Sequence, residues 1–141
     1  MSLSSPPGAG TGLSMPAAPS ESPEAIAIAV VRLLQRHRFD LSAEKKLQAD
    51  VESALTATGI VFEREKVLSP RDIPDFLVAG GVVIECKMRG ARKMDVWKQL
   101  CRYAEHDSVT ALILAANFTM GLPAEIEGKP LFAASLSRGW L

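Results

Sequence analysis

The segment DIPDFLVAGGVVIECKM, residues 72–88, constrains the fold of this chain more than any other feature. Two apolar runs rich in Val and Ile flank a pair of glycines, a pattern typical of two strands joined by a tight turn. Three charged residues, Asp75, Glu85 and Lys87, lie near the outer ends of these runs. The segment therefore predicts a β-hairpin that carries charge where a small domain normally places apolar side chains.

The length of the hairpin loop determines which charges face each other. A two-residue loop would pair Asp75 with Cys86 and turn Asp75 away from Glu85, whereas a three-residue loop, residues 79–81, pairs Asp75 directly with Glu85. Three-residue loops need a left-handed backbone at their last position, which Gly81 adopts without steric cost. The longer loop is therefore the prediction.

A divalent cation would account for two opposed carboxylates. Glu85 and Lys87 share a face by the two-residue period of a strand, so both converge with Asp75. Directly opposed like charges destabilise a strand pair. Hard oxygen ligands suit Mg²⁺ or Mn²⁺, bound by the two carboxylates, a backbone carbonyl such as that of Cys86, and water. The alternative is a solvated hairpin face on which Lys87 pairs with Glu85, and both interpretations stay open.

Length and composition limit the chain to one core and one site. The 141 residues suffice for one compact domain, expected over residues 21–141, after a Ser-, Pro- and Gly-rich segment, residues 1–20, predicted to be disordered. The formal net charge is zero, so any nucleic-acid binding depends on local patches. Cys86 and Cys101 form no CxxC pair, and no apolar run approaches the ~18 residues of a membrane span. A cytoplasmic protein without membrane contact is expected.

Periodicity along the chain predicts an α/β fold. A first helix begins at Pro23 with Ser22 as N-cap. The order helix, strand, strand, strand, helix, strand then follows in the segments 41–59, 60–68, 72–78, 82–88, 92–107 and 109–117. The continuous apolar run of the last segment is typical of a strand buried on both faces. Beyond it, we expect a loop over residues 121–130, a strand over 130–136, and a tail in which Trp140 is available to pack back onto the body.

The helix over residues 41–59 places one acid among apolar residues. Glu44 falls within the arc of the helical wheel that includes Leu47 and Val51. A buried carboxylate is expected to meet a cation, a metal-bound water or a lysine. The alternative is an edge residue at the start of the helix, where the dipole favours an acid.

In the helix over residues 92–107, we predict a core stripe that leaves two polar residues to one side. The stripe consists of Met94, Trp97, Cys101 and Ala104. Gln99 and Tyr103 are four residues apart, hence neighbours, and lie off this stripe. Tyr103 is then either part of a site or a surface residue that packs on its neighbour.

Together these residues resemble the PD-(D/E)xK phosphodiesterase superfamily, which has the restriction-endonuclease-like fold and includes RecB-type nucleases and Holliday-junction resolvases. The match consists of Pro74-Asp75, then Glu85-Cys86-Lys87 on the next strand, with Glu44 on the preceding helix. Gln99 and Tyr103 look like the Q-x-x-x-Y signature of the RecB-like branch. The element order from residue 41 to residue 117, about half of the chain, is similar to the family's αβββαβ core, a mixed sheet flanked by helices.

The resemblance implies metal-dependent hydrolysis of DNA, with branched or repair intermediates among the substrates. Asp75 and Glu85 would hold Mg²⁺ or Mn²⁺, and Glu44 would complete the carboxylate shell or hold a water. Lys87 would orient and help to deprotonate the attacking water. Gln99 and Tyr103 would position Lys87 or the scissile phosphate, and no histidine is needed. His37 and His106 are therefore interpreted as surface residues.

Contacts to the DNA backbone must come from local basic residues, because the net charge supplies none. The loop MRGARK, residues 88–93, is the best candidate for a phosphate-contacting loop. The predicted nucleic-acid-binding residues are Lys45, Arg89, Arg92, Lys93 and Lys98. Cleavage of two strands would favour a homodimer, whereas a nickase could act alone.

Two other functions stay open. One is a non-catalytic nucleic-acid-binding or protein-interaction module with the same fold, which would gain nothing from carboxylates that repel phosphate. The other is a small-molecule enzyme, for which the sequence has neither a phosphate-cradling glycine motif nor a nucleophile with a base.

Overall fold

The structure is a computed structural model and describes residues 21–138. The predicted disordered segment, residues 1–20, and Trp140 lie outside the described residues. Three helices are found within residues 21–138: α1 (Pro23–Arg36), α2 (Glu44–Ala57) and α3 (Lys93–Ala104). The strands in the same range are β1 (Arg38–Phe39), β2 (Phe62–Arg64), β3 (Phe76–Val78), β4 (Val82–Lys87), β5 (Ala111–Ala116), β6 (Glu125–Ile126), β7 (Lys129–Ser135) and β8 (Ser137–Arg138).

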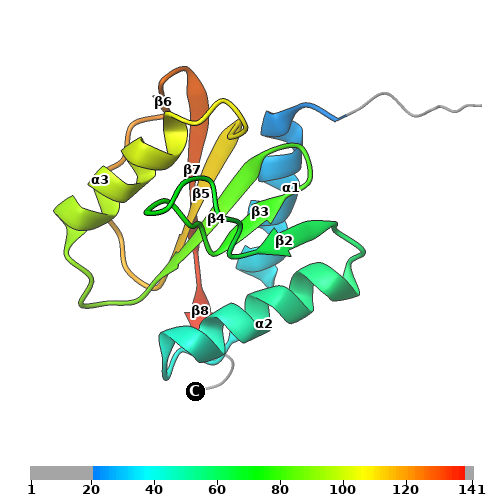
Figure 1. Ribbon diagram of the computed structural model, residues 1–141. Helices are drawn as coiled ribbons and strands as arrows, with labels where there is room; N and C mark the ends of the chain where they lie inside the picture. The colour runs from blue at the N-terminus through cyan, green and yellow to red at the C-terminus, as the bar shows by residue number, and fades with distance from the viewer. Residues whose placement is uncertain (1–20, 139–141) are drawn as a thin grey trace, which may run out of the picture.

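A mixed six-stranded sheet forms the centre of the fold, in the order β2-β3-β4-β5-β7-β6 (Figure 1). β2, β3 and β4 are antiparallel neighbours, β4, β5 and β7 run parallel, and β6 returns antiparallel to β7. β1 and β8 form a separate parallel pair. The α/β class and the predicted helix-strand-strand-strand-helix-strand order, here α2-β2-β3-β4-α3-β5, are confirmed.

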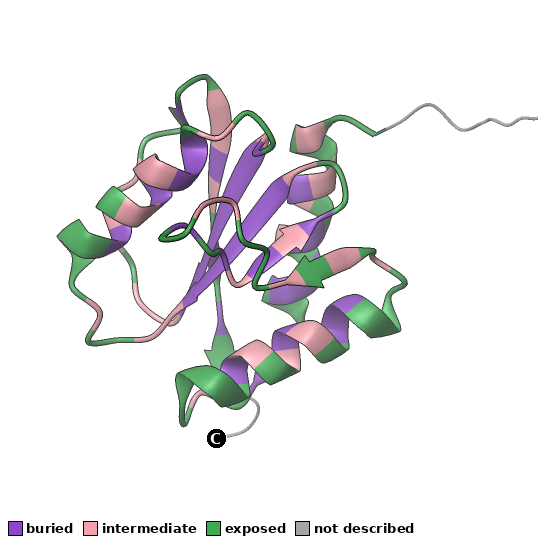
Figure 2. Cartoon of the chain, in the orientation of Figure 1, coloured by how far each residue is buried: buried purple, intermediate pink, exposed green. Residues whose placement is uncertain are grey.

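Helices cover both faces of the sheet (Figure 1). α1 and α2 pack on one face against β3, β4 and β5, in a cluster that includes Leu34, Leu55 and Ile84. α3 packs on the other face, in a cluster that includes Leu100 and Leu112. β4 and β5 are therefore buried from both sides (Figure 2), and the prediction of a fully buried strand over residues 109–117 is confirmed for all of β5.

The predicted start of the first helix and the predicted end of the second are confirmed. The Ser22 side chain accepts a hydrogen bond of 3.1 Å from the Ala25 N–H and caps α1, with Pro23 as its first residue. Gly59 follows the end of α2 with a φ of 77°, in the left-handed region that glycine adopts at helix C-termini.

The C-terminal part of the described chain contains more strand than predicted. The strand over residues 130–136 is confirmed as β7, but the loop predicted over residues 121–130 contains β6, and the predicted tail contains β8. Both additional strands have two residues and are formed by pairing with a neighbour. Two residues are too few for a periodic sequence pattern, so only the tertiary fold reveals them.

The predicted core stripe of α3 is wrong in its orientation. Met94 is 62% exposed, whereas Tyr103, predicted to lie off the stripe, is fully buried. The buried face consists of Val96, Leu100, Tyr103 and Ala104. Both sets have helical spacing and share Ala104, so local periodicity does not distinguish them.

None of the helices between residues 21 and 138 combines the length and the apolar character that a bilayer-spanning segment requires.

Candidate active site

The hairpin of β3 and β4 has the predicted three-residue loop. Phe76 pairs with Ile84 and Val78 pairs with Val82, which leaves residues 79–81 as the loop. Continued by one residue, this register places Asp75 opposite Glu85. The prediction that the two carboxylates face each other on adjacent chain segments is confirmed.

Gly81, the last residue of the loop, fixes this register. Its φ is 90°, and a Cβ at this position would clash with the Ser108 carbonyl oxygen and lie 2.8 Å from the Thr110 hydroxyl. The Gly81 carbonyl accepts a hydrogen bond of 2.8 Å from the Thr110 N–H, which ties the loop to the start of β5. A larger residue would lose both the backbone conformation and the close approach.

Glu85 is the buried centre of the site, with a residue exposure of 3%. Its Oε1 accepts hydrogen bonds from the Asp75 N–H and the Tyr103 hydroxyl, each 3.2 Å long. Lys87 Nζ lies 3.2 Å from the other carboxylate oxygen, Oε2. Tyr103 is therefore a partner of the site, and its interpretation as a surface residue is wrong.

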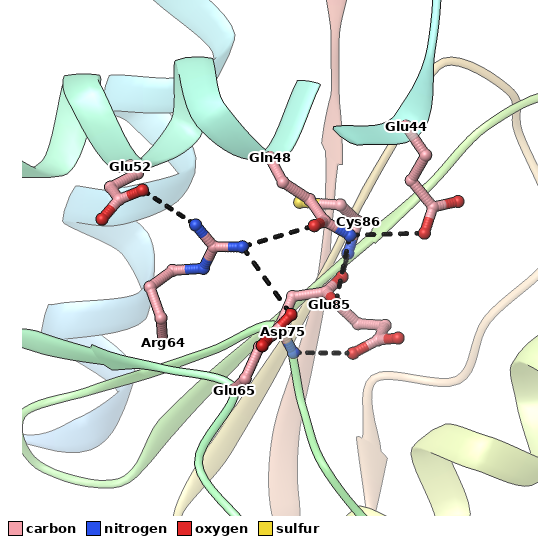
Figure 3. Close-up of polar contacts among 8 residues, drawn as sticks. All are labelled: Glu44, Gln48, Glu52, Arg64, Glu65, Asp75, Glu85 and Cys86. Atoms are coloured by element: carbon pink, nitrogen blue, oxygen red, sulfur yellow. Dashed lines mark hydrogen bonds and ion pairs between the residues drawn. The ribbon is translucent and has the colours of Figure 1, made fainter. Parts of the chain in front are cut away.

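Asp75 is half-buried and joins the hairpin to α2 (Figure 3). Its Oδ2 accepts a hydrogen bond of 2.7 Å from the Cys86 N–H. Its Oδ1 accepts one of 3.3 Å from the side-chain amide of Gln48 on α2. These contacts fix the carboxylate beside β4, immediately before the start of β3.

Burial makes both carboxylates weaker acids. Desolvation raises the pKa of Asp75 to about 6, against the lowering influence of the Cys86 N–H and of Lys87. Desolvation, followed by repulsion from Asp75, raises the pKa of Glu85 to about 7, although Lys87 opposes the rise. The fold therefore disfavours the charged forms of both acids, and a bound cation would favour them.

Gln48 and Arg64 support Asp75 and were not singled out in the sequence. Arg64 donates to the Gln48 side-chain oxygen at 3.3 Å, which directs the amide N–H groups toward Asp75 (Figure 3). Arg64 is itself held by Glu52 at 2.8 Å and lies over the Phe76 ring. The available signal was the i, i+4 spacing of Gln48 from Glu44 on one helix.

Glu44 is exposed, so its predicted position in the core arc of α2 is wrong. It is the first residue of α2, and burial in this helix starts one turn later at Leu47. Its carboxylate accepts a hydrogen bond of 3.4 Å from the Gln48 amide, which also contacts Asp75. Glu44 therefore lies at the solvent edge of the site, as the alternative interpretation held.

The other predicted residues are distributed around this centre. Lys87 and Gln99 line a pocket of about 400 Å³ between β4 and α3, together with Arg92 and Lys98. Three predicted residues are exposed and do not line this pocket. Arg89 and Lys93 lie around the start of α3, and Lys45 lies on α2. The structure thus brings together five predicted residues directly, Asp75, Glu85, Cys86, Lys87 and Tyr103.

Of the two histidines, only His37 is the surface residue that was predicted. His106 lies 2.9 Å from the carboxylate of Asp72, a buried acid that the sequence pattern did not single out. Arg102 contacts the same carboxylate at 2.9 Å. The pKa of Asp72 is lowered, first by the hydrogen bond from His106.

The oxygen ligands that Asp75, Glu85 and the Cys86 carbonyl offer fit a cation with few protein ligands. In the described part of the chain, no three His, Cys, Asp or Glu side chains gather closely enough to hold a metal ion. Mg²⁺ commonly uses one or two carboxylates and retains water. Pro74, which the register places opposite Cys86, has no N–H to donate to the Cys86 carbonyl, so that oxygen remains available as a ligand.

Comparisons of this chain with protein-family models, curated proteins and solved structures found no match.

Proposed function

We propose that this protein is a Mg²⁺- or Mn²⁺-dependent endonuclease of the PD-(D/E)xK type, which hydrolyses DNA phosphodiester bonds, including those of branched or repair intermediates. The observation that carries the proposal is the opposition of Asp75 and Glu85 at the end of a buried hairpin, with Lys87 Nζ 3.2 Å from Glu85. In a purely structural hairpin, two half-buried or buried acids whose negative charges repel each other are unfavourable.

Asp75, Glu85 and the Cys86 carbonyl would hold the cation, and Glu44 would act from the solvent edge. A bound Mg²⁺ or Mn²⁺ supplies positive charge to the phosphoryl oxygens and increases the acidity of water. The pKa values of Asp75 and Glu85, about 6 and about 7, support this assignment, because a cation favours the charged forms that burial disfavours.

Lys87 would act on the water and the phosphate. It is mostly buried, its ammonium contacts Glu85, and its side chain lines the pocket beside α3. An ammonium has three donors, so Lys87 can keep the bond to Glu85 while it orients a water or a phosphoryl oxygen. Tyr103 holds Glu85 from α3, and the neighbouring Gln99 lies at the pocket wall toward the substrate.

The arrangement of elements is consistent with a restriction-endonuclease-like core. The order α2-β2-β3-β4-α3-β5 places Asp75 before β3 and Glu85 and Lys87 on β4. β4 and β5 are parallel and connected by α3, the arrangement of a crossover unit. These features support the family assignment.

DNA would approach over the pocket lined by Lys87, Arg92 and Lys98. These side chains add local positive charge to a chain whose formal net charge is zero. Exposed Arg89 and Lys93 extend this charge at the start of α3, and Lys45 would contact the backbone on the α2 side.

A second candidate function is a nucleic-acid-binding module that does not cleave. The observation that favours it is that no third acidic, histidine or cysteine ligand joins Asp75 and Glu85 within residues 21–138. The two candidates differ in product formation, since only the nuclease produces shorter strands.

The experiment is incubation of the protein with labelled duplex, single-stranded, flap and four-way-junction DNA in Mg²⁺, Mn²⁺ or EDTA. The nuclease is expected to cleave at least one substrate in either cation and none in EDTA, and Lys87→Ala is expected to be inactive. Binding of DNA without cleavage under all conditions would favour the second candidate. Equal cleavage by Lys87→Ala would show a contaminating nuclease or a different site.

A further inference from the structure

Arg102 is held in one orientation at the wall of the pocket by a buried acid. Asp72 is 7% exposed, and its Oδ1 lies 2.9 Å from Arg102 Nε. Its other oxygen, Oδ2, lies 2.9 Å from His106 Nε2. Because each carboxylate oxygen has its own partner, the carboxylate is held both to Arg102 on α3 and to His106 just after the end of that helix.

The backbone around Asp72 is fixed as well. Its carbonyl oxygen accepts a hydrogen bond of 2.9 Å from the Leu68 N–H, and its own N–H donates to the Ser69 carbonyl at 3.1 Å. The turn formed by residues 68–72 therefore presents the carboxylate to α3 from a closed loop. Rigid support of this kind reduces the entropy lost when Arg102 binds a ligand.

The contact with Asp72 uses only one of the donors of Arg102. A guanidinium has five N–H donors, and the bond to Asp72 is made by Nε. The four N–H groups on the terminal nitrogens have no hydrogen-bond partner among residues 21–138. The side chain lines the same pocket of about 400 Å³ as Lys87. Its donors are therefore available beside the candidate catalytic lysine.

The pocket has the charge that an anion requires. Four cationic side chains and a single carboxylate line it: Lys87, Arg92, Lys98, Arg102 and Asp95. The carboxylate of Asp95 is 3.6 Å from Arg92, and both side chains are exposed. Arg102, by contrast, is anchored to the buried Asp72. Like Lys87, which contacts Glu85, it is therefore held in position before a ligand binds.

We infer that Arg102, oriented by Asp72 and His106, binds one backbone phosphate of the nucleic acid in this pocket and thereby positions the strand relative to Lys87. The planar fork of arginine matches two phosphate oxygens, which a lysine at the same position does not. The inference rests on the proposed function for its substrate class, a nucleic acid. Asp72 and His106 are positioning residues in this arrangement, since they act through Arg102.

The test measures DNA affinity in EDTA, so it does not depend on cleavage. Arg102→Lys keeps the charge but loses the fork, and we expect about tenfold weaker binding to the best-bound DNA of the substrate panel. Arg32→Lys, an exposed residue of α1 on the opposite face of the sheet, is the matched control and should bind within twofold of the parent. Equal affinity of Arg102→Lys and the parent would overturn the inference.

Single neutral methylphosphonates along the DNA identify the contacted phosphate. The parent is expected to lose affinity at particular positions, and Arg102→Lys should lose less than the parent at one of them, because the bidentate contact to that phosphate is already absent. A merely structural role of Arg102 would leave the position dependence unchanged, and that result would contradict the inference.

Asp72→Asn tests the positioning role. It should weaken binding about as much as Arg102→Lys, and the double variant should be no weaker than either single variant. Additive losses would mean that Asp72 does not act through Arg102 and would overturn this part. If Asp72→Asn does not fold, the methylphosphonate map of Arg102→Lys decides. If the parent binds DNA but does not cleave it in either cation, the proposed nuclease activity is wrong and the inferred phosphate contact stands. If the parent does not bind DNA at all, the inferred contact is wrong.

Discussion

Replacing Glu85 with glutamine is expected to stabilise the metal-free protein at neutral pH. Glutamine keeps an oxygen that can accept from the Asp75 N–H and the Tyr103 hydroxyl, the two donors to Glu85 Oε1. It removes the buried negative charge and the repulsion between that charge and Asp75. Lys87 loses its ion pair, but its side chain also lines the open pocket and can turn its ammonium toward water.

The size of the effect follows from the raised pKa of Glu85. A change of the Glu85 pKa from 4.5 in the unfolded chain to about 7 in the folded chain corresponds to about 3 kcal/mol at pH above 7. Because Asp75 shares part of this repulsion, we expect a gain of about 2–3 kcal/mol for Glu85→Gln at pH 7.5. That gain corresponds to about 5–10 °C in melting temperature.

The dependence on pH has a defined sign. A carboxyl whose folded pKa is raised binds more protons in the folded state, so the stability of the parent should increase as pH falls through about 7 toward 4.5. Asp75, with a folded pKa of about 6 against 3.8 unfolded, acts in the same direction. Glu85→Gln should therefore show a flatter profile than the parent.

The assay is urea unfolding in EDTA at pH 7.5 and pH 5.0, with Glu63→Gln as the control. Glu63 is an exposed acid on β2 whose ion pair with Lys66 is open to solvent, so its replacement should change stability little. Lower stability of Glu85→Gln than of the parent at pH 7.5, or a parent whose stability is equal at both pH values, would refute the reasoning.

The remaining predictions concern three other residues of the site. Lys87→Ala should reduce cleavage by roughly 10²-fold or more, with DNA affinity within a few-fold of the parent, as measured by single-turnover cleavage and by binding in EDTA. Tyr103→Phe should lower the stability at pH 7.5 by about 1 kcal/mol in urea unfolding, because Glu85 loses a buried donor; an unchanged stability would show that this bond contributes nothing. Glu44→Leu should change stability by less than about 0.5 kcal/mol, since Glu44 is exposed. Its cleavage rate then tests the catalytic role alone, and full activity would remove Glu44 from the site.

Local chemistry predicted the hairpin and its charges correctly. The left-handed preference of Gly81 selected the three-residue loop, and the two-residue period of β4 placed Glu85 and Lys87 on one face. These arguments depend on neighbours in sequence, and the tertiary structure does not change them.

Long-range packing determined what the sequence could not reveal. The rotation of α3 that buries Tyr103 and exposes Met94 depends on the face that the sheet presents, since both stripes have helical spacing. Glu44 falls on the apolar arc of a wheel, but residues 44–46 at the start of α2 are exposed and burial begins only at Leu47. Asp72 meets partners 30 and 34 residues away, a separation at which no local pattern exists.

The central claim, that Asp75 and Glu85 form a cation site, can be tested without knowledge of the substrate. The measurement is calorimetric titration of the protein with Mn²⁺ at pH 8, where both carboxyls with pKa values of about 6 and about 7 are mostly charged. The account predicts binding of Mn²⁺ to the parent with release of residual protons, and loss of that binding in Glu85→Gln with retention in Glu63→Gln. Absence of binding to the parent, or equal binding to Glu85→Gln, would contradict it.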